Sequence, residues 1–138
     1  MLLVKSTEYV GGTTAYSAGT TWISVSKYAP NVNHEDTSTN AEAFLTCAVG
    51  EYSSAAMRRA FLDAGPKAVA YIEANSDVKY RARPFHPDYL SELEGSTLRG
   101  RALEPLPFDG RKIGHAFSLI RSPIPEFTVL GGMMVDRS

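Results

Sequence analysis

The chain opens on a short hydrophobic run that stops before a pair of glycines. Residues 2–4 are Leu, Leu and Val, a polar stretch follows, and Gly11 and Gly12 come next. A short apolar run closed by glycines is typical of a buried strand that enters a loop. The pattern therefore predicts a strand at 2–4 and a loop over residues 13–24, which show no clean period.

Helical spacing dominates residues 39–75. Thr39 and Glu42 have the spacing of a capping box, in which each side chain reaches a free backbone N–H at the start of a helix. Gly50 stands where a glycine can end that helix. The apolar face between them consists of Phe44, Leu45 and Ala48. We therefore predict a helix that is capped by Thr39 and ends at Gly50.

A second helix is predicted to start near Ser53 or Ser54. Gly65 and Pro66 predict a break, and a third helix is expected after it because proline suits the first helical position. The apolar stripes expected for these two helices are Met57, Ala60, Phe61 and Ala64, and then Val69 and Ile72. Beyond them, apolar and basic residues alternate over 78–82, which predicts a strand.

Residues 84–125 have a different character. Prolines stand at 84, 87, 105, 107, 123 and 125, and glycines at 95, 100, 110 and 114. Such a segment cannot hold a long helix. Its aromatic and leucine residues argue against simple disorder, and a long loop in a compact domain is often functional. The segment 127–135 that follows is apolar and predicts a further strand.

Composition excludes several classes of protein. The chain has 138 residues, which suits one domain, and its formal net charge of −1 gives no electrostatic reason to expect a nucleic-acid partner. No apolar run approaches the roughly 20 residues that span a bilayer, so no membrane partner is expected. Cys47 is the one cysteine, which excludes an internal disulfide and fits a cytoplasmic location.

The loop after the first predicted strand carries candidate binding chemistry. Glycines let a backbone approach a ligand closely, and hydroxyls and free N–H groups donate hydrogen bonds to phosphate oxygens. By itself this pattern fits an anion-binding loop and a glycine turn that binds nothing equally well. The residues of this candidate site are Gly11, Gly12, Thr13, Thr14, Ser17, Ala18, Gly19 and Thr20.

Three segments together resemble a known family. The first is residues 2–23, with the GGTT loop and Trp22-Ile23; the second is residues 83–89, with Pro87-Asp88-Tyr89. The third is residues 99–111, followed by Pro125-Glu126-Phe127 and the glycines and methionines of 131–134. In this order they are similar to FAD-dependent oxidoreductases of the fumarate reductase and 3-oxosteroid 1-dehydrogenase group. The resemblance covers most of the chain.

The resemblance implies a fold and an organisation. The fold class is α/β (or α+β), with a partial Rossmann-like FAD-binding domain over residues 1–138. Within it, residues 1–24 would supply the second strand and the GGTT loop. Residues 39–75 would form a helical segment, and residues 84–125 would form Pro-rich loops on the substrate side.

The resemblance also implies a cofactor, a substrate and roles for site residues. FAD would be held by the loop of Gly11, Gly12 and the six neighbouring residues named above. Tyr89 matches a tyrosine that the dehydrogenase branch places near the substrate, where it could move a proton. The substrate would be a small molecule, such as a steroid, another enone or a dicarboxylate. The alternative for Tyr89 is a partly buried aromatic whose hydroxyl donates to a backbone carbonyl.

Other reactive residues predict no site. His34, His86 and His115 lack metal-ligand spacing, so no metal is expected. Cys47 is interpreted as a buried, inert thiol on the first helix. The arginines, for which a solvated surface is the default, are Arg99, Arg101 and Arg111.

Two departures from the family pattern bear on function. Lys5 stands where the family carries an acidic residue, and an ammonium cannot accept a hydrogen bond from the adenosine ribose. The G-x-G-x-x-G turn of the family is absent from this sequence. The alternative expectation is a truncated, non-catalytic product or a fragment that needs another chain to complete the FAD site. Unpaired strand edges would then favour self-association.

Overall fold

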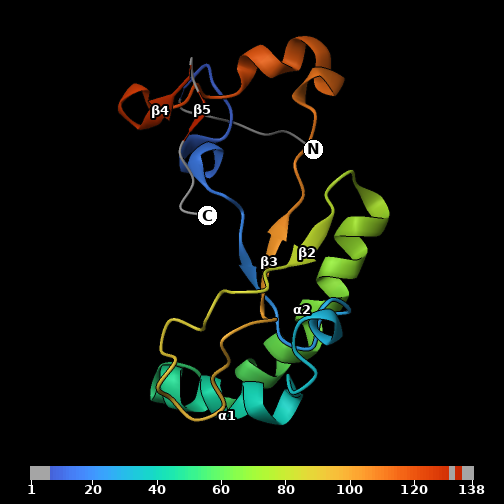
Figure 1. The fold of residues 1–138 in the computed structure, drawn as a ribbon, viewed down its shortest axis with the longest axis vertical. Coiled ribbons are helices and arrows are strands. Elements are labelled where there is room, and N and C mark those ends of the chain that lie inside the picture. Colours follow the sequence, from blue (N-terminus) through green and yellow to red (C-terminus); the bar gives the residue numbers. More distant parts are fainter. Residues whose placement is uncertain (1–6, 131–132, 135–138) are drawn as a thin grey trace. The chain divides into compact units, whose positions relative to one another are not determined.

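A computed structural model describes residues 7–130 and 133–134 of the chain. The chain divides into two compact units (Figure 1): unit 1 is Met1–Gly19 with Pro107–Ser138, and unit 2 is Thr20–Leu106. The strand predicted at 2–4, and Lys5, lie outside the described residues. The predicted Pro-rich segment 84–125 is divided between the two units.

Unit 2 combines two α-helices with a small sheet. Helix α1 spans Ser38–Val49 and helix α2 spans Ala55–Asn75, joined by a 3-10 turn at Gly50–Tyr52. Strands β1 (Thr21–Trp22), β2 (Tyr80–Ala82) and β3 (Ala102–Pro105) form an antiparallel sheet in the order β1-β3-β2. The predicted mixed class of helices and strands is confirmed.

The core of unit 2 forms where α2 covers this sheet. Leu103 on β3 is fully buried, and it packs with Ile23 and Val69. The partly buried side chains around this cluster are Tyr28, Tyr80 and Ala82. Burial of a few large apolar side chains supplies the main stabilisation of such a unit. The predicted strand over 78–82 is confirmed as β2. Neither β3 nor β1 was predicted, and β1 lies within residues 13–24, where a loop was expected.

The start of α1 corrects the predicted cap. The N-cap is Thr37, whose hydroxyl accepts a hydrogen bond from the backbone N–H of Asn40 at 3.2 Å. Thr39, the predicted cap, lies inside the helix. Both threonines satisfy the local rule for an N-cap, and the path of the preceding chain decides between them. The predicted end at Gly50 is confirmed. Of the two predicted starts of α2, near Ser53 or Ser54, the structure has Ser54 as the N-cap.

Helix α2 also corrects the predicted break, because it continues through Pro66. A proline removes one backbone hydrogen bond and crowds the preceding turn. Here the helix is held on both sides of that position: Phe61 stacks on Trp22 with ring centroids 6.0 Å apart, and Val69 lies in the core. Gly65 is buried against Ile23, where an added Cβ would lie 3.2 Å from Ile23 Cδ1. Packing therefore outweighs the local cost of the proline.

Unit 1 consists of short elements. A 3-10 helix spans Gly12–Tyr16, and a second stretch of 3-10 turns spans Gly110–Leu119 with a kink at Gly114. Val10 and Ile120 form a parallel bridge between these two parts of the sequence. The apolar segment near the C-terminal end forms the antiparallel pair β4 (Thr128–Val129) and β5 (Met133–Met134), two strands where one was predicted.

Helix α2, with 21 residues, is the longest of the helices in the described residues. Within 7–130 and 133–134, none combines the length and apolar character required to cross a membrane. Residues 84–125 contain no α-helix, as the proline content predicted.

Candidate functional site

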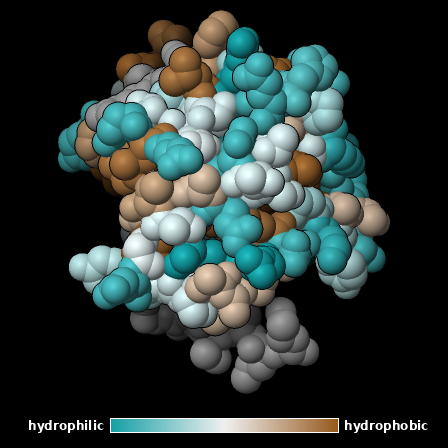
Figure 2. Space-filling view, turned by 90° about the horizontal axis from the view of Figure 1, so that it is seen from below, coloured by the Kyte–Doolittle hydropathy of each residue, from teal (hydrophilic) through white to brown (hydrophobic). Residues whose placement is uncertain are grey.

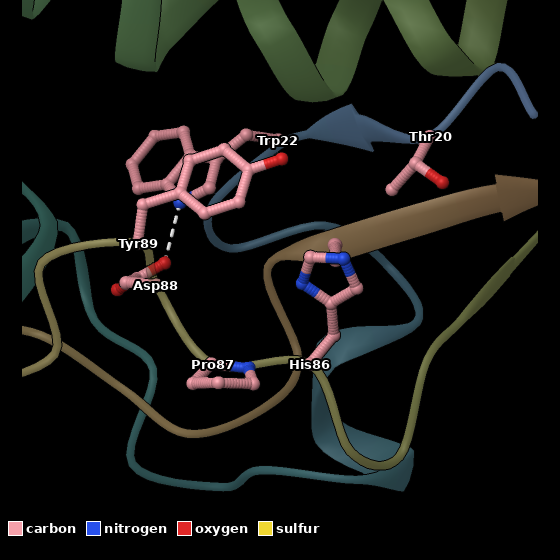
Figure 3. Close-up of a pocket in the computed structure, with 7 residues that line it drawn as sticks. Thr20, Trp22, His86, Pro87, Asp88 and Tyr89 are labelled. Atoms are coloured by element: carbon pink, nitrogen blue, oxygen red, sulfur yellow. Dashed lines mark hydrogen bonds between the residues drawn. The ribbon is translucent and has the colours of Figure 1, made fainter. Parts of the chain in front are cut away.

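A small open pocket of about 110 Å³ lies in unit 2. Its residues come from β1 and its entry, from the loop that follows β2, and from the start of β3. Figure 3 shows His86, Asp88 and Tyr89 rising from one loop toward the side of β1. The lining residues are Thr20, Trp22, His86, Pro87, Asp88, Tyr89 and Ala102. Tyr89, the predicted catalytic residue, and Thr20, a predicted cofactor-binding residue, therefore line one pocket.

The side chain of Tyr89 is exposed to solvent. It is 96% exposed, and its one aromatic neighbour among the described residues is His86, with ring centroids 6.4 Å apart in an edge-on arrangement. Within the described residues its hydroxyl makes no hydrogen bond. The alternative of a partly buried tyrosine bonded to a carbonyl is therefore wrong. An exposed phenol at a pocket rim can approach a bound molecule directly.

Asp88, next to Tyr89, is buried and fully bonded. Its Oδ1 accepts from Trp22 Nε1 at 2.6 Å. Its Oδ2 accepts from Arg101 Nη1 at 2.8 Å and from the backbone N–H of Thr97 at 2.9 Å. Asp88 thus ties the Pro-Asp-Tyr loop to Trp22, which also lines the pocket, and to Arg101.

Arg101 corrects the prediction of a solvated arginine. Its residue exposure is 1%, and its Nε donates to Asp36 Oδ1 at 2.8 Å. Its guanidinium carbon lies 5.4 Å from the ring centroid of Trp22, close enough for a cation–π contact. No periodic pattern marks this cluster, because Asp36 and Arg101 are 65 positions apart and Asp36 lies in an irregular polar stretch.

The glycine loop lies in unit 1, apart from Thr20. Gly11, Gly12 and Gly19 have φ values of 109°, 51° and 71°, a backbone region that residues other than glycine rarely adopt. A Cβ at Gly11 would come within 2.8 Å of Ala15 Cβ. Ser17 Oγ accepts from the N–H of Gly19 at 3.0 Å and so closes the loop.

The loop offers hydrogen-bond donors of the kind that the phosphates of FAD would accept from. Thr13, Thr14 and Ser17 are exposed, so their hydroxyls face outward as possible donors. Gly11 precedes the 3-10 helix Gly12–Tyr16, and Gly12 is its first residue. Both have a positive φ, and neither places a Cβ beside the first backbone N–H groups of the helix. The predicted residues from Gly11 to Gly19 lie in one continuous loop of unit 1, in which Ala18 is exposed.

The remaining reactive residues give no second site. Cys47 is exposed, so the prediction of a buried thiol is wrong. Arg111 pairs with Asp109 at 2.7 Å, and Arg99 is exposed. In the part of the chain that the structure describes, no group of three or more His, Cys, Asp or Glu side chains could hold a metal ion.

Comparison with known proteins gives consistent matches. The family model described as "FAD binding domain" matches residues 1–126. The 3-oxosteroid 1-dehydrogenase of Mycolicibacterium smegmatis is 31% identical over 122 residues, covering 88% of this chain and 21% of that protein. The 4-oxocyclohex-2-ene-1-carboxylate 5-dehydrogenase of Sinomonas cyclohexanicum is 31% identical over 133 residues, covering 96% of this chain and 22% of that protein.

Comparison with solved structures also finds a dehydrogenase. A crystal structure of 3-ketosteroid delta1-dehydrogenase from Sterolibacterium denitrificans, in complex with 1,4-androstadiene-3,17-dione, is similar to this chain with a TM-score of 0.78 and 30% identity. The match covers 85% of this chain and 20% of that one. The chain spans about a fifth of the length of the curated relatives it matches.

Proposed function

Because the chain belongs to the FAD binding domain family, we propose that it forms part of an FAD-dependent dehydrogenase that acts on the activated C–C bond of a 3-ketosteroid or a related cyclic ketone. The observation that carries this proposal is Tyr89, an exposed phenol held at the rim of a pocket by its buried neighbour Asp88. The names of the relatives support the dehydrogenase direction of the reaction.

We propose a separate role for each segment of the chain. The segment 1–24 serves the cofactor, with Gly12 and Thr14 against the diphosphate of FAD and Gly11, Thr13, Ser17, Ala18, Gly19 and Thr20 beside it. The loops of 84–125 serve the substrate side, and the helices over 39–75 support them. FAD, when bound, supplies an acceptor for a hydride from carbon.

Tyr89 is proposed to serve in proton transfer. Removing hydrogen across a C–C bond breaks one C–H bond as hydride and the neighbouring C–H bond as a proton, and leaves a C=C double bond. A tyrosine positioned at the second carbon can take that proton as the phenolate, or relay it by passing its own hydroxyl proton to a neighbouring base or water. The imidazole of His86 lies edge-on to the Tyr89 ring, with ring centroids 6.4 Å apart, and its nitrogens can exchange protons.

A substitution at Tyr89 tests this function. In the FAD-loaded protein that carries this chain, Tyr89→Phe should lower kcat for 3-ketosteroid dehydrogenation by about 10²- to 10⁴-fold, the usual contribution of an acid–base group. The melting temperature should not change, since the side chain is 96% exposed. The matched control is Tyr52→Phe, because Tyr52 is 100% exposed in the turn between α1 and α2. Full activity in Tyr89→Phe would refute the assignment.

We also propose two properties of the chain as a whole. Exposed aromatic and aliphatic side chains suggest self-association, and Figure 2 shows hydrophobic residues surfacing among hydrophilic ones on one face. The most exposed large ones include Tyr52, Phe85, Leu98 and Leu130. We also propose a cytoplasmic location, because an exposed free thiol at Cys47 suits a reducing compartment.

A further inference from the structure

The loop that carries Tyr89 is anchored one residue earlier. The side chain of Asp88 is 2% exposed and accepts from Trp22 Nε1, Arg101 Nη1 and the N–H of Thr97 at 2.6, 2.8 and 2.9 Å. The backbone N–H of Asp88 donates to the carbonyl of Thr97 at 2.9 Å. Both the carboxylate and the peptide are thus fixed. Figure 3 shows the bond from Trp22 to Asp88.

Arg101 places one cation between two buried carboxylates. Its Nε is 2.8 Å from Asp36 Oδ1 and its Nη1 is 2.8 Å from Asp88 Oδ2. The side chains of Asp36 and Arg101 are 0% and 1% exposed. Charge-assisted bonds in such a dry setting are strong and directional, and losing one partner leaves an uncompensated buried charge. The planar guanidinium sets the separation of the two carboxylates.

Asp36 extends the cluster to a strained turn. Its Oδ2 accepts from the backbone N–H of Val25 at 2.6 Å, and its Oδ1 accepts from Ser24 Oγ at 3.0 Å. Val25 has a φ of 52°, which is costly for a β-branched residue and persists only where the surroundings enforce it. This turn directly follows the segment that carries Trp22. The contacts of Arg101 with Asp36 and Asp88 therefore link that segment to the loop of Tyr89.

The side chain of Tyr89 has no comparable support. Within the described residues it makes no hydrogen bond, and His86 is its aromatic contact. The position of the phenol is therefore set from the backbone, through Asp88. Resting on the proposed role of Tyr89, we propose that Arg101, held by Asp36, is a positioning residue that fixes Tyr89 at the pocket by way of Asp88.

The competing explanation is that Arg101 only stabilises the fold. Arg101→Lys separates the two, because lysine keeps the charge and most of the buried stem but lacks the planar fork that reaches both carboxylates. Positioning predicts a local loosening of residues 86–97. A purely structural role predicts a uniform loss of stability throughout unit 2.

Amide hydrogen exchange of the 138-residue chain, followed by NMR, measures this directly. In Arg101→Lys the amides of Asp88 and Thr97 should exchange about tenfold faster or more, while the amide of Val69 in α2 keeps its rate. Equal acceleration at all three amides, or no change at any, would overturn the proposal. If Arg101→Lys does not fold, Asp36→Asn should give the same local pattern, since it preserves shape and removes the charge opposite Arg101. Arg111→Lys, at an exposed Asp–Arg pair, is the matched control and should change none of these rates.

A kinetic readout separates this proposal from the proposed function. In the FAD-loaded protein, Arg101→Lys should lower kcat about tenfold or more with little change in KM, and should add almost nothing in a Tyr89→Phe background, because residues acting through one another are not additive. Additive losses would overturn the positioning role. If Tyr89→Phe alone is fully active, the proposed function fails, while the exchange rates still decide whether Arg101 fixes the loop.

Discussion

Gly12 has a φ of 51° at the start of the 3-10 helix Gly12–Tyr16, in the loop proposed to hold FAD. Gly12→Val should abolish FAD retention in the protein that carries this chain, because a branched Cβ would enter the proposed phosphate contact. Strain alone costs about 1–2 kcal/mol in this conformation. Gly114→Val controls for strain, since Gly114 has a φ of 57° in the same unit with open space around its Cβ position. Flavin absorbance of the purified variants decides: equal retention in both would refute the assignment.

At the scale of secondary-structure elements, the start of α1 rests on Thr37. Thr37→Ala should lower the free energy of unfolding by about 1 kcal/mol, because the N–H of Asn40 loses its acceptor. Thr39→Ala, two residues inside the helix, should leave stability unchanged or slightly raised, since alanine favours helix. Urea denaturation measures both. The reverse ranking would mean that the cap lies at Thr39.

Glu73 joins α2 to β2 and to the turn before α1. It is 7% exposed, pairs with Lys27 at 2.8 Å, and accepts from the hydroxyl of Tyr28 and from the backbone N–H of Tyr80. Burial raises the pKa of its carboxyl, but the hydrogen bonds from Lys27, Tyr28 and Tyr80 outweigh burial, so the pKa lies below its ordinary value of 4.5.

A lowered pKa in the folded state fixes the sign of the pH dependence. The ionised Glu73 stabilises the fold at pH values above 4.5, and this contribution is lost as the pH falls through the lower folded-state value. The melting temperature should therefore decrease on acidification below about pH 4.5. The Glu73→Gln variant should be less stable at pH 7, and its melting temperature should change less on acidification. Glu51→Gln, at an exposed glutamate, should behave as wild type. An unchanged acid dependence in Glu73→Gln would contradict this origin.

At the scale of the whole molecule, exposed hydrophobic side chains favour association. Leu130 is 90% exposed beside the two-stranded β4–β5 pair, and a short pair of strands leaves edges open to further pairing. Sedimentation velocity should show an average mass that rises above 15.0 kDa with concentration. The effect should persist at high salt, because its cause is apolar. A monomer at every concentration would exclude self-association.

The sequence by itself determined features that depend on near neighbours. Patterns within a few residues predicted the start of α2 near Ser53 or Ser54, the end of α1 at Gly50 and the strand around Tyr80, because the hydrogen bonds and side-chain periodicity involved are local. The family was also readable, because the GGTT loop and the Pro-Asp-Tyr motif keep their residue types in order. Their chemistry is carried by glycine backbone and by specific functional groups.

Only the tertiary structure decided what burial and distant contacts control. Pro66 stays inside α2 because packing on both sides holds the helix, and Cys47 lies on the exposed side of α1. Arg101 is buried between Asp36 and Asp88, partners 65 and 13 positions away. A charged residue in a sequence defaults to solvent, since burying it alone is too costly. The fold reverses that default by bringing two carboxylates to one guanidinium, an arrangement that no local pattern encodes.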